Sequence, residues 1–146
     1  MESISFNKFK KCLDDWAKQN EIGEQCLSRQ VLGKPSIELE PITNNLRQIL
    51  DCMFDEYCQM LHKLEIEEIA VNNEQESNNH HIPEQVVLLK KCLEMYDQEY
   101  MVKDCIRDIV SGEGFATQQH LAGSMALWRS ESYLDEEIQR KIKHLN

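Results

Sequence analysis

The side chains that most often carry chemistry are, in this sequence, six cysteines and one pair of adjacent histidines, His80 and His81. A structural zinc site takes about four cysteine or histidine ligands at characteristic spacings. No two cysteines form a C-x-x-C pair, and none is close in sequence to the two histidines. A cysteine–histidine nucleophile can still form through the fold, but no local spacing favours one. We therefore expect no metal, no cofactor and reduced, mostly buried thiols at Cys12, Cys26, Cys52, Cys58, Cys92 and Cys105.

Neighbouring carboxylates, another common sign of catalysis, are placed unfavourably. Asp14 and Asp15, like Glu67 and Glu68, are adjacent in segments that we expect to be helical, where consecutive side chains diverge by about 100°. The chain also has no P-loop, no dinucleotide-binding motif and no zinc-protease motif. The sequence therefore predicts a protein that is not an enzyme. A small thiol-dependent enzyme is the alternative that the cysteines leave open.

The composition indicates which partners the chain is suited to bind. With 26 acidic and 16 basic residues among 146, the formal charge is −10. Binding to a phosphate backbone needs clustered lysine and arginine, so we expect no direct contact with nucleic acid. No apolar run approaches the ~20 residues that cross a bilayer, and the first residues do not form a secretory signal. We expect an intracellular protein without a membrane partner.

The N-terminal region, 4–33, is predicted to contain two helices. Apolar residues recur at helical spacing over 4–20, where Ser3 or Ser5 can act as the cap. Gly23 is expected to interrupt the helix and a shorter one to follow it. Two prolines then predict a connector without regular structure, Pro35 and Pro41.

The longest periodic segment is predicted to be a helix over 44–71, capped by Thr43 or Asn44. Its apolar positions step 4-3-4-3-4, which is the period at which one helix winds against another. These positions, called the 46–64 seam below, are Leu46, Leu50, Met53, Tyr57, Met60 and Leu64. The spacing leaves open whether the seam packs within the chain, in a homodimer or against a partner.

A second long helix is predicted over 83–111, after a polar, asparagine-rich loop at 72–82. The short connection favours an antiparallel helical hairpin spanning 44–111. Two short helices are expected in the region 115–145. The predicted fold is a single all-α domain over 1–146: a long helical hairpin or coiled coil, an N-terminal helix and two short C-terminal helices.

The candidate binding residues are apolar or aromatic, because Trp and Tyr bury much area for little lost side-chain entropy. Trp128 stands next to the polar run Arg129–Ser132, and Tyr133 follows five residues later. We expect contacts with helical subunits of a hetero-oligomer along the 46–64 seam and at Met95, Tyr96, Trp128 and Tyr133.

Several short motifs resemble those of one protein family. A Leu-Glu-Met-Tyr run at 93–96 is followed by a glycine break at 112–114, and then by Met125, Trp128 and Tyr133. Near the start, a Leu-x-x-Trp helix leads into an Asn-x-x-Gly exit, and the connector carries Ile-Glu-Leu, at Leu13, Trp16, Asn20, Gly23 and 37–39. In these features the chain is similar to the cyclin-dependent kinase 2-interacting proteins, most clearly over 88–145. It departs from them in the loop 72–83 and in the segment 24–33.

The resemblance implies a non-enzymatic adaptor that acts in the nucleus, with the cytoplasm as an additional location. It also implies links to cell-cycle kinases, to DNA replication and checkpoint factors, and to an AAA+ ATPase assembly on chromatin and pre-ribosomes. The residues themselves leave another class open, a coiled-coil subunit of a microtubule or kinetochore complex, because such chains share this acidity and heptad spacing.

Overall fold

Five α-helices make up the described part of the computed structural model, residues 5–72 and 83–145, with side chains described except at 66–72. Their bounds are Asn7–Ser28 for α1, Glu40–Asn72 for α2, Glu84–Gly112 for α3, Gln118–Ser130 for α4 and Glu136–Lys143 for α5. None of these described residues lies in a strand, so the predicted all-α class is confirmed. Ser3, the loop residues 73–82 and the histidine pair within them lie outside the described residues.

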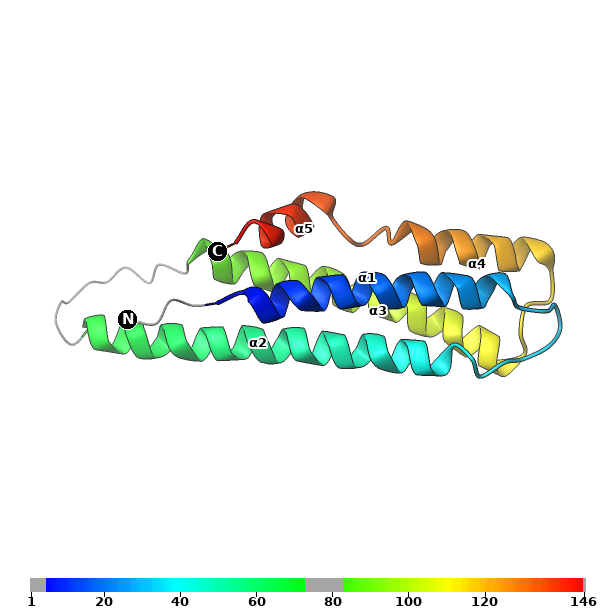
Figure 1. Ribbon diagram of the computed structural model, residues 1–146, viewed down its shortest axis with the longest axis horizontal. Helices are drawn as coiled ribbons and strands as arrows, with labels where there is room; N and C mark the ends of the chain where they lie inside the picture. Colours follow the sequence, from blue (N-terminus) through cyan, green and yellow to red (C-terminus); the bar gives the residue numbers. More distant parts are fainter. Residues whose placement is uncertain (1–4, 73–82, 146) are drawn as a thin grey trace.

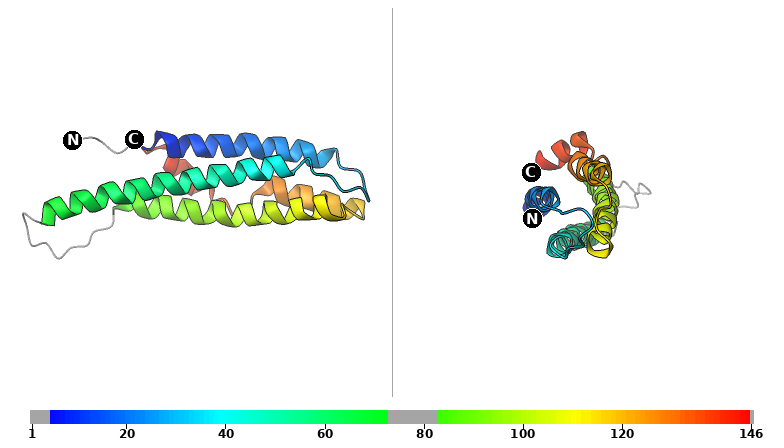
Figure 2. Two further views of the ribbon diagram at one scale, coloured as in Figure 1. Left: turned by 90° about the horizontal axis from the view of Figure 1, so that it is seen from below. Right: turned by 90° about the vertical axis from the view of Figure 1, so that its right-hand side faces the viewer.

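The long helices run in alternating directions, and α2 packs on both α1 and α3 (Figure 1). α4 packs on α1 and α3, and α5 continues along α3 (Figure 2). Together α4 and α5 therefore occupy the fourth position of an up-and-down four-helix bundle. The packing of α2 on α3 is the arrangement that the predicted hairpin requires, whereas a coiled-coil form of this pair is not confirmed. Within the described ranges, no helix combines the length and the apolarity needed to cross a bilayer.

The core of the bundle consists of apolar side chains from all five helices and the turns between them. Its largest fully buried members include Trp16, Tyr96, Phe115 and Trp128. Four of the six seam residues also belong to the core, namely Leu46, Leu50, Met53 and Met60, and Tyr57 and Leu64 are half-buried at its edge. Each fully buried side chain of this size contributes about 1.5–3 kcal/mol to folding, so the seam is a main source of the bundle's stability.

The prediction of two N-terminal helices was wrong, because α1 runs without a break from Asn7 to Ser28. Gly23 lies inside this helix and is buried against the indole of Trp128. A Cβ at this position would lie 2.8 Å from Cε2 of that ring and closer still to Cζ2. The glycine therefore marks a close approach between α1 and α4 and does not end the helix.

The start of α2 also differs from the prediction. The helix begins at Glu40, with Pro41 in its first turn, where a missing backbone N–H costs nothing. Thr43 is consequently inside the helix, and its hydroxyl donates to Glu40 O at 3.0 Å. Neither Thr43 nor Asn44 is the cap. The short C-terminal helices, in contrast, are capped by the side chains of Thr117 and Asp135.

Candidate protein-interaction site

Trp128 was predicted to face a partner, and this prediction was wrong for the chain in its folded form. Its side chain is fully buried, and its Nε1 donates to Asn20 O of α1 at 2.9 Å. The Nζ of Lys103 lies 4.3 Å from the centre of the indole ring, in the arrangement of a cation–π contact. The polar run after Trp128 suggested exposure, but Arg129 and Ser130, which lie in the same helix, point to other sides of α4 than Trp128 does.

Met95 and Tyr96 are also buried in the bundle and so do not form an exposed binding face. The Tyr96 ring meets Trp16 edge to face, with 5.0 Å between centroids, and its hydroxyl accepts a hydrogen bond from Gln139 Nε2 at 3.0 Å. Met95 Sδ accepts a hydrogen bond from Asp135 N at 3.3 Å. Both residues thereby fix α5 to α3. Burial is the main cause that raises the pKa of the Tyr96 hydroxyl.

Among the four C-terminal candidates, Tyr133 alone keeps an exposed side chain, 51% of which is accessible. Its backbone N–H donates to Glu99 Oε2 at 3.3 Å, so the turn that carries it is fixed while the ring faces solvent. Tyr133 therefore remains a candidate for partner contact.

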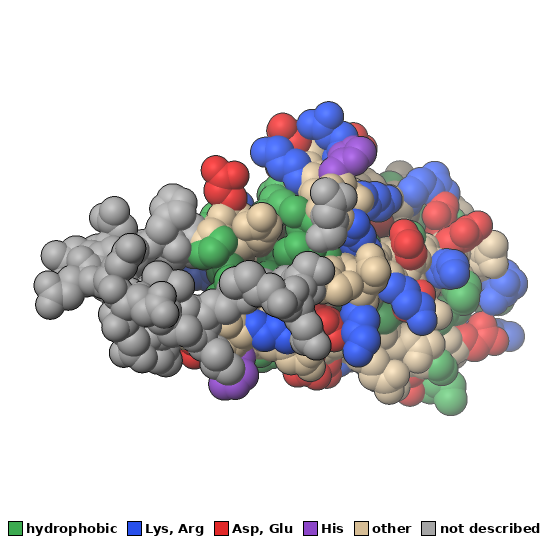
Figure 3. All heavy atoms as spheres, turned by 60° about the vertical axis from the view of Figure 1, so that its left-hand side comes forward, with side chains coloured by type: hydrophobic (Ala, Val, Ile, Leu, Met, Phe, Trp, Pro, Cys, Tyr) green, Lys and Arg blue, Asp and Glu red, His purple; other side chains and the backbone are tan. Residues whose placement is uncertain are grey.

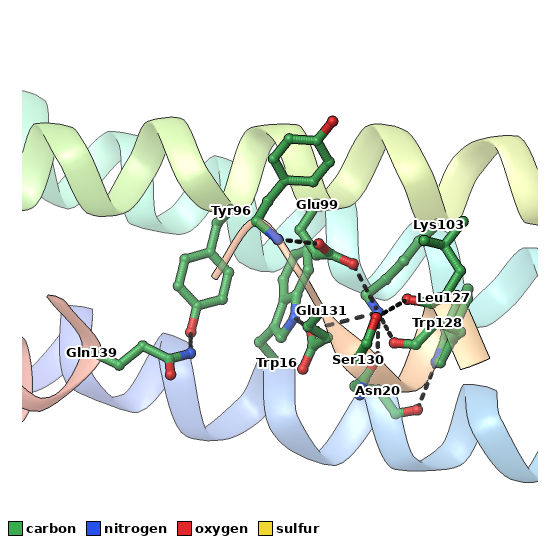
Figure 4. A network of polar contacts seen from close by, with 11 residues as sticks. Trp16, Asn20, Tyr96, Glu99, Lys103, Leu127, Trp128, Ser130, Glu131 and Gln139 are labelled. Carbon is green, nitrogen blue, oxygen red and sulfur yellow. Dashed lines mark hydrogen bonds and ion pairs between the residues drawn. The ribbon is translucent and has the colours of Figure 1, made fainter. Parts of the chain in front are cut away.

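A buried cation connects four segments of the chain (Figure 4). Lys103 of α3 is fully buried, and its Nζ donates to Asn20 Oδ1 of α1 and, at 3.0 Å, to Trp128 O of α4. The same Nζ lies 3.6 Å from Glu99 Oε1 and 3.5 Å from Glu131 Oε2. The ammonium group thus contacts α1, α4, its own helix and the turn between α4 and α5.

The two carboxylates of this network each have a second donor. Glu131 Oε2 accepts from Trp16 Nε1 at 2.8 Å, and Glu99 Oε2 accepts from the Tyr133 backbone. Glu131 ends α4 with φ +43°, a left-handed conformation that is unfavourable for a residue with a Cβ. Its contacts with Trp16 and Lys103 offset that cost, so the network holds the turn at which the fourth position of the bundle divides into two helices.

The electrostatics of this network follow from its burial. Desolvation is the main cause that raises the pKa of Glu99 above its usual 4.5, and desolvation also lowers the pKa of Lys103 from 10.5. Attraction between the opposite charges works against both shifts. The Lys103 and Glu99 side chains are 0% and 1% exposed, so a substrate has no access to them in this conformation. The network is a structural cross-link that the sequence analysis missed.

The 46–64 seam reaches the surface on one side, where α2 and α3 enclose an open groove of about 480 Å³. This groove is called the α2–α3 groove below, and its apolar lining consists of Leu50, Phe54, Tyr57 and Leu93. Leu50 is largely buried in its floor, whereas Phe54 is 56% exposed. Most of the seam packs inside the chain, so the seam as a whole is not an exposed binding face. Its outer edge remains available.

A second apolar groove lies between α3 and α4 and is lined by Val102, Ile106, Ile109 and Leu127. Leu127 is 45% exposed at its edge. The connector between α1 and α2 also carries exposed apolar side chains, including Ile37 at 70%. The face in Figure 3 shows basic and acidic side chains interspersed, without a large area of either sign.

The cysteines and other potential metal ligands are dispersed over the bundle. In the ranges 5–72 and 83–145, no three histidine, cysteine or acidic side chains come together in a group that could hold a metal ion. All six cysteines are free thiols, three buried and three exposed. Burial, followed by the neighbouring Cys52 thiol, raises the pKa of Cys12 to about 12.

Searches of protein-family models, curated proteins and solved structures find no match to this chain. The class of protein that the geometry defines is therefore a helical bundle with apolar grooves on its outer faces. The resemblance to the cyclin-dependent kinase 2-interacting proteins stays a prediction from the sequence motifs.

Proposed function

We propose that this chain is a non-enzymatic adaptor, a helical subunit that joins other proteins through apolar side chains on the outside of its bundle. The observation that carries the proposal is the exposure of large apolar residues at structured positions on several faces, namely Phe54, Met101, Leu127 and Tyr133. Single exposed apolar residues are common, but Phe54 and Leu127 border grooves, which is typical of protein-binding surfaces.

The family resemblance supports a narrower form of the proposal. In that form the chain connects cell-cycle kinases and DNA replication or checkpoint factors with an AAA+ ATPase assembly on chromatin and pre-ribosomes. The supporting motifs lie at 93–96, 112–114 and 125–133. The alternative, a coiled-coil subunit of a microtubule or kinetochore complex, relied on the heptad spacing of the 46–64 seam. Because this spacing is largely used inside the bundle, we favour the adaptor.

Affinity purification of the full chain from cells that express it naturally, followed by mass spectrometry, tests both forms. We expect at least one protein to co-purify in stoichiometric amount, and the narrower form requires an AAA+ ATPase or a cell-cycle kinase among such proteins. The tag alone serves as the control. Recovery of the chain by itself, at the mass of a monomer, would contradict the adaptor function, and recovery with microtubule or kinetochore proteins would favour the alternative.

A further inference from the structure

We infer that the α2–α3 groove binds a cationic amphipathic helix of a partner protein; this inference rests on the proposed adaptor function and specifies its site. The groove is formed by two antiparallel helices whose facing residues span 47–57 and 90–97. At about 1.5 Å per residue, these stretches are about 15 Å and 10 Å long. At about 5.4 Å per turn, two to three turns of a partner helix cover this length, and such a helix can pack on the pair by ridge-into-groove contacts.

The apolar part of the groove provides an anchor point for such a helix. Phe54 is exposed for 56% of its surface, and the half-buried Tyr57 and Leu93 lie on either side of the groove. A partner's leucine or methionine placed between them would bury apolar surface that the bundle itself leaves in water. Aromatic side chains in this position commonly account for much of the binding energy of an interface.

The charged rim of the groove determines the chemistry of the partner. Arg47 is already paired with Asp51 at 3.3 Å, and its guanidinium carbon lies 5.6 Å from the centre of the Tyr100 ring. Of the remaining rim charges, Lys90 is basic, whereas Glu94 and Asp97 are acidic and form no ion pair with another described residue. The open charge of the rim is thus negative, which matches lysine or arginine beside the apolar face of a partner helix.

The same charges argue against other occupants. A phosphate backbone or an anionic bilayer would be repelled by the rim and by a chain with a formal charge of −10. A second copy of the chain carries the same negative charge, which disfavours self-association. A cationic helix of a different protein is therefore the occupant that the groove fits best.

Two synthetic peptides can test the inference with the full chain. The first has 16 residues with leucines at i, i+3, i+4 and i+7 and lysines beside them, and in the second every lysine is replaced by glutamate. We expect the lysine peptide, titrated into ¹⁵N-labelled protein, to shift amide signals of 47–57 and 90–97, and the glutamate peptide to bind at least about tenfold more weakly. Equal binding of both peptides, or shifts confined to another face, would overturn the inference.

Variants separate the groove from the rest of the surface. Phe54→Glu should weaken the lysine peptide by about tenfold or more, whereas Ile37→Glu, the same kind of change at an exposed connector position, should leave its affinity unchanged. Glu94→Lys combined with Asp97→Lys should reverse the preference between the peptides. Circular dichroism checks that each variant remains helical. Binding that is insensitive to Phe54→Glu would refute the groove as the site.

Two further outcomes distinguish this inference from the proposed function. If a protein co-purifies with the chain and Phe54→Glu retains it, the groove is not its site, although the adaptor function stands. If nothing co-purifies, the adaptor function itself fails. Sedimentation velocity should show a monomer, and a dimer abolished by Phe54→Glu would assign the groove to a second copy and overturn the inference.

Discussion

Replacing Gly23 by alanine provides the most direct test of how α4 is held to the bundle. Gly23 is buried inside α1, in its C-terminal third, where alanine would ordinarily be the better residue by about 1 kcal/mol. Here the added Cβ would lie 2.8 Å or less from the Trp128 ring, well inside the 3.4 Å of ordinary contact. The ring is fully buried and joined to Asn20 and Lys103, so it has little freedom to move away.

The size of the effect follows from these opposing contributions. Forcing an extra methyl group into a packed core costs about 1–3 kcal/mol. Complete loss of a buried aromatic side chain costs about 3–5 kcal/mol, which sets the upper limit if α4 detaches. Taking about 3 kcal/mol for a rigid indole and subtracting about 1 kcal/mol of helix propensity, we expect Gly23→Ala to lower the free energy of unfolding by about 2 kcal/mol. In a chain of this length the melting temperature should fall by roughly 5–8 °C.

Urea unfolding followed by circular dichroism measures this difference, and Gly123→Ala is the matched control. Gly123 lies inside α4, and an added Cβ would meet no atom within 4 Å. The control should therefore gain about 0.5–1 kcal/mol from propensity alone. If Gly23→Ala is as stable as the control variant, the result would contradict the close packing of the Trp128 ring against Gly23.

Three further predictions concern the buried network, a helix cap and the thiols. Lys103→Met leaves Glu99 and Glu131 without their cation and should lower the free energy of unfolding, measured in urea, by about 3–5 kcal/mol. Adding Glu99→Gln should restore part of this loss. Strictly additive effects of the two substitutions would contradict a coupled network. Asp135→Ala removes an oxygen that accepts from Glu137 N at 2.8 Å, so it should lower stability by about 1 kcal/mol, and an unchanged unfolding midpoint would argue against this cap. At pH 8 a thiol reagent should rapidly modify the three exposed cysteines, Cys52, Cys58 and Cys105, and should reach the three buried ones only in denaturant. Burial raises the pKa of Cys92 to about 12 and so keeps this thiol protonated. Uniform reaction of all six cysteines in the native protein would contradict the burial.

The sequence was sufficient for the features that depend on periodicity and local capping. Heptad spacing over 46–64 predicted a long helix with a continuous packed stripe, and α2 has both. The cap of α4 at Thr117 is a signal of the same local kind, because a cap residue acts on the backbone within three residues of itself. Such features depend on residues that are close together in the sequence, so the sequence alone is enough to predict them.

The features that the sequence did not reveal depend on contacts between distant segments. Gly23 read as a helix break, yet its role is set by an indole 105 positions away in the chain. Glu99 and Lys103 were missed because the buried side of a helix is traced by its apolar residues, and these two residues are charged. Their spacing nevertheless continues the buried stripe that includes Tyr96, Ile106 and Val110, in steps of three and four. A charged i, i+4 pair inside an otherwise apolar heptad was the available signal.

The burial of the seam changes where a partner can bind but does not remove the basis for an adaptor. A helix in a four-helix bundle uses one stripe for its neighbours and leaves the opposite side in water. In α2 the inner stripe contains Leu46, Met53 and Met60, whereas Phe54 lies on the outer side, one position after Met53. Replacing Phe54 with a charged residue should therefore affect binding and hardly affect folding, whereas the same change at Met53 should unfold the bundle. Stability and the proposed recognition by α2 therefore depend on different sides of the same helix, and single substitutions can separate them.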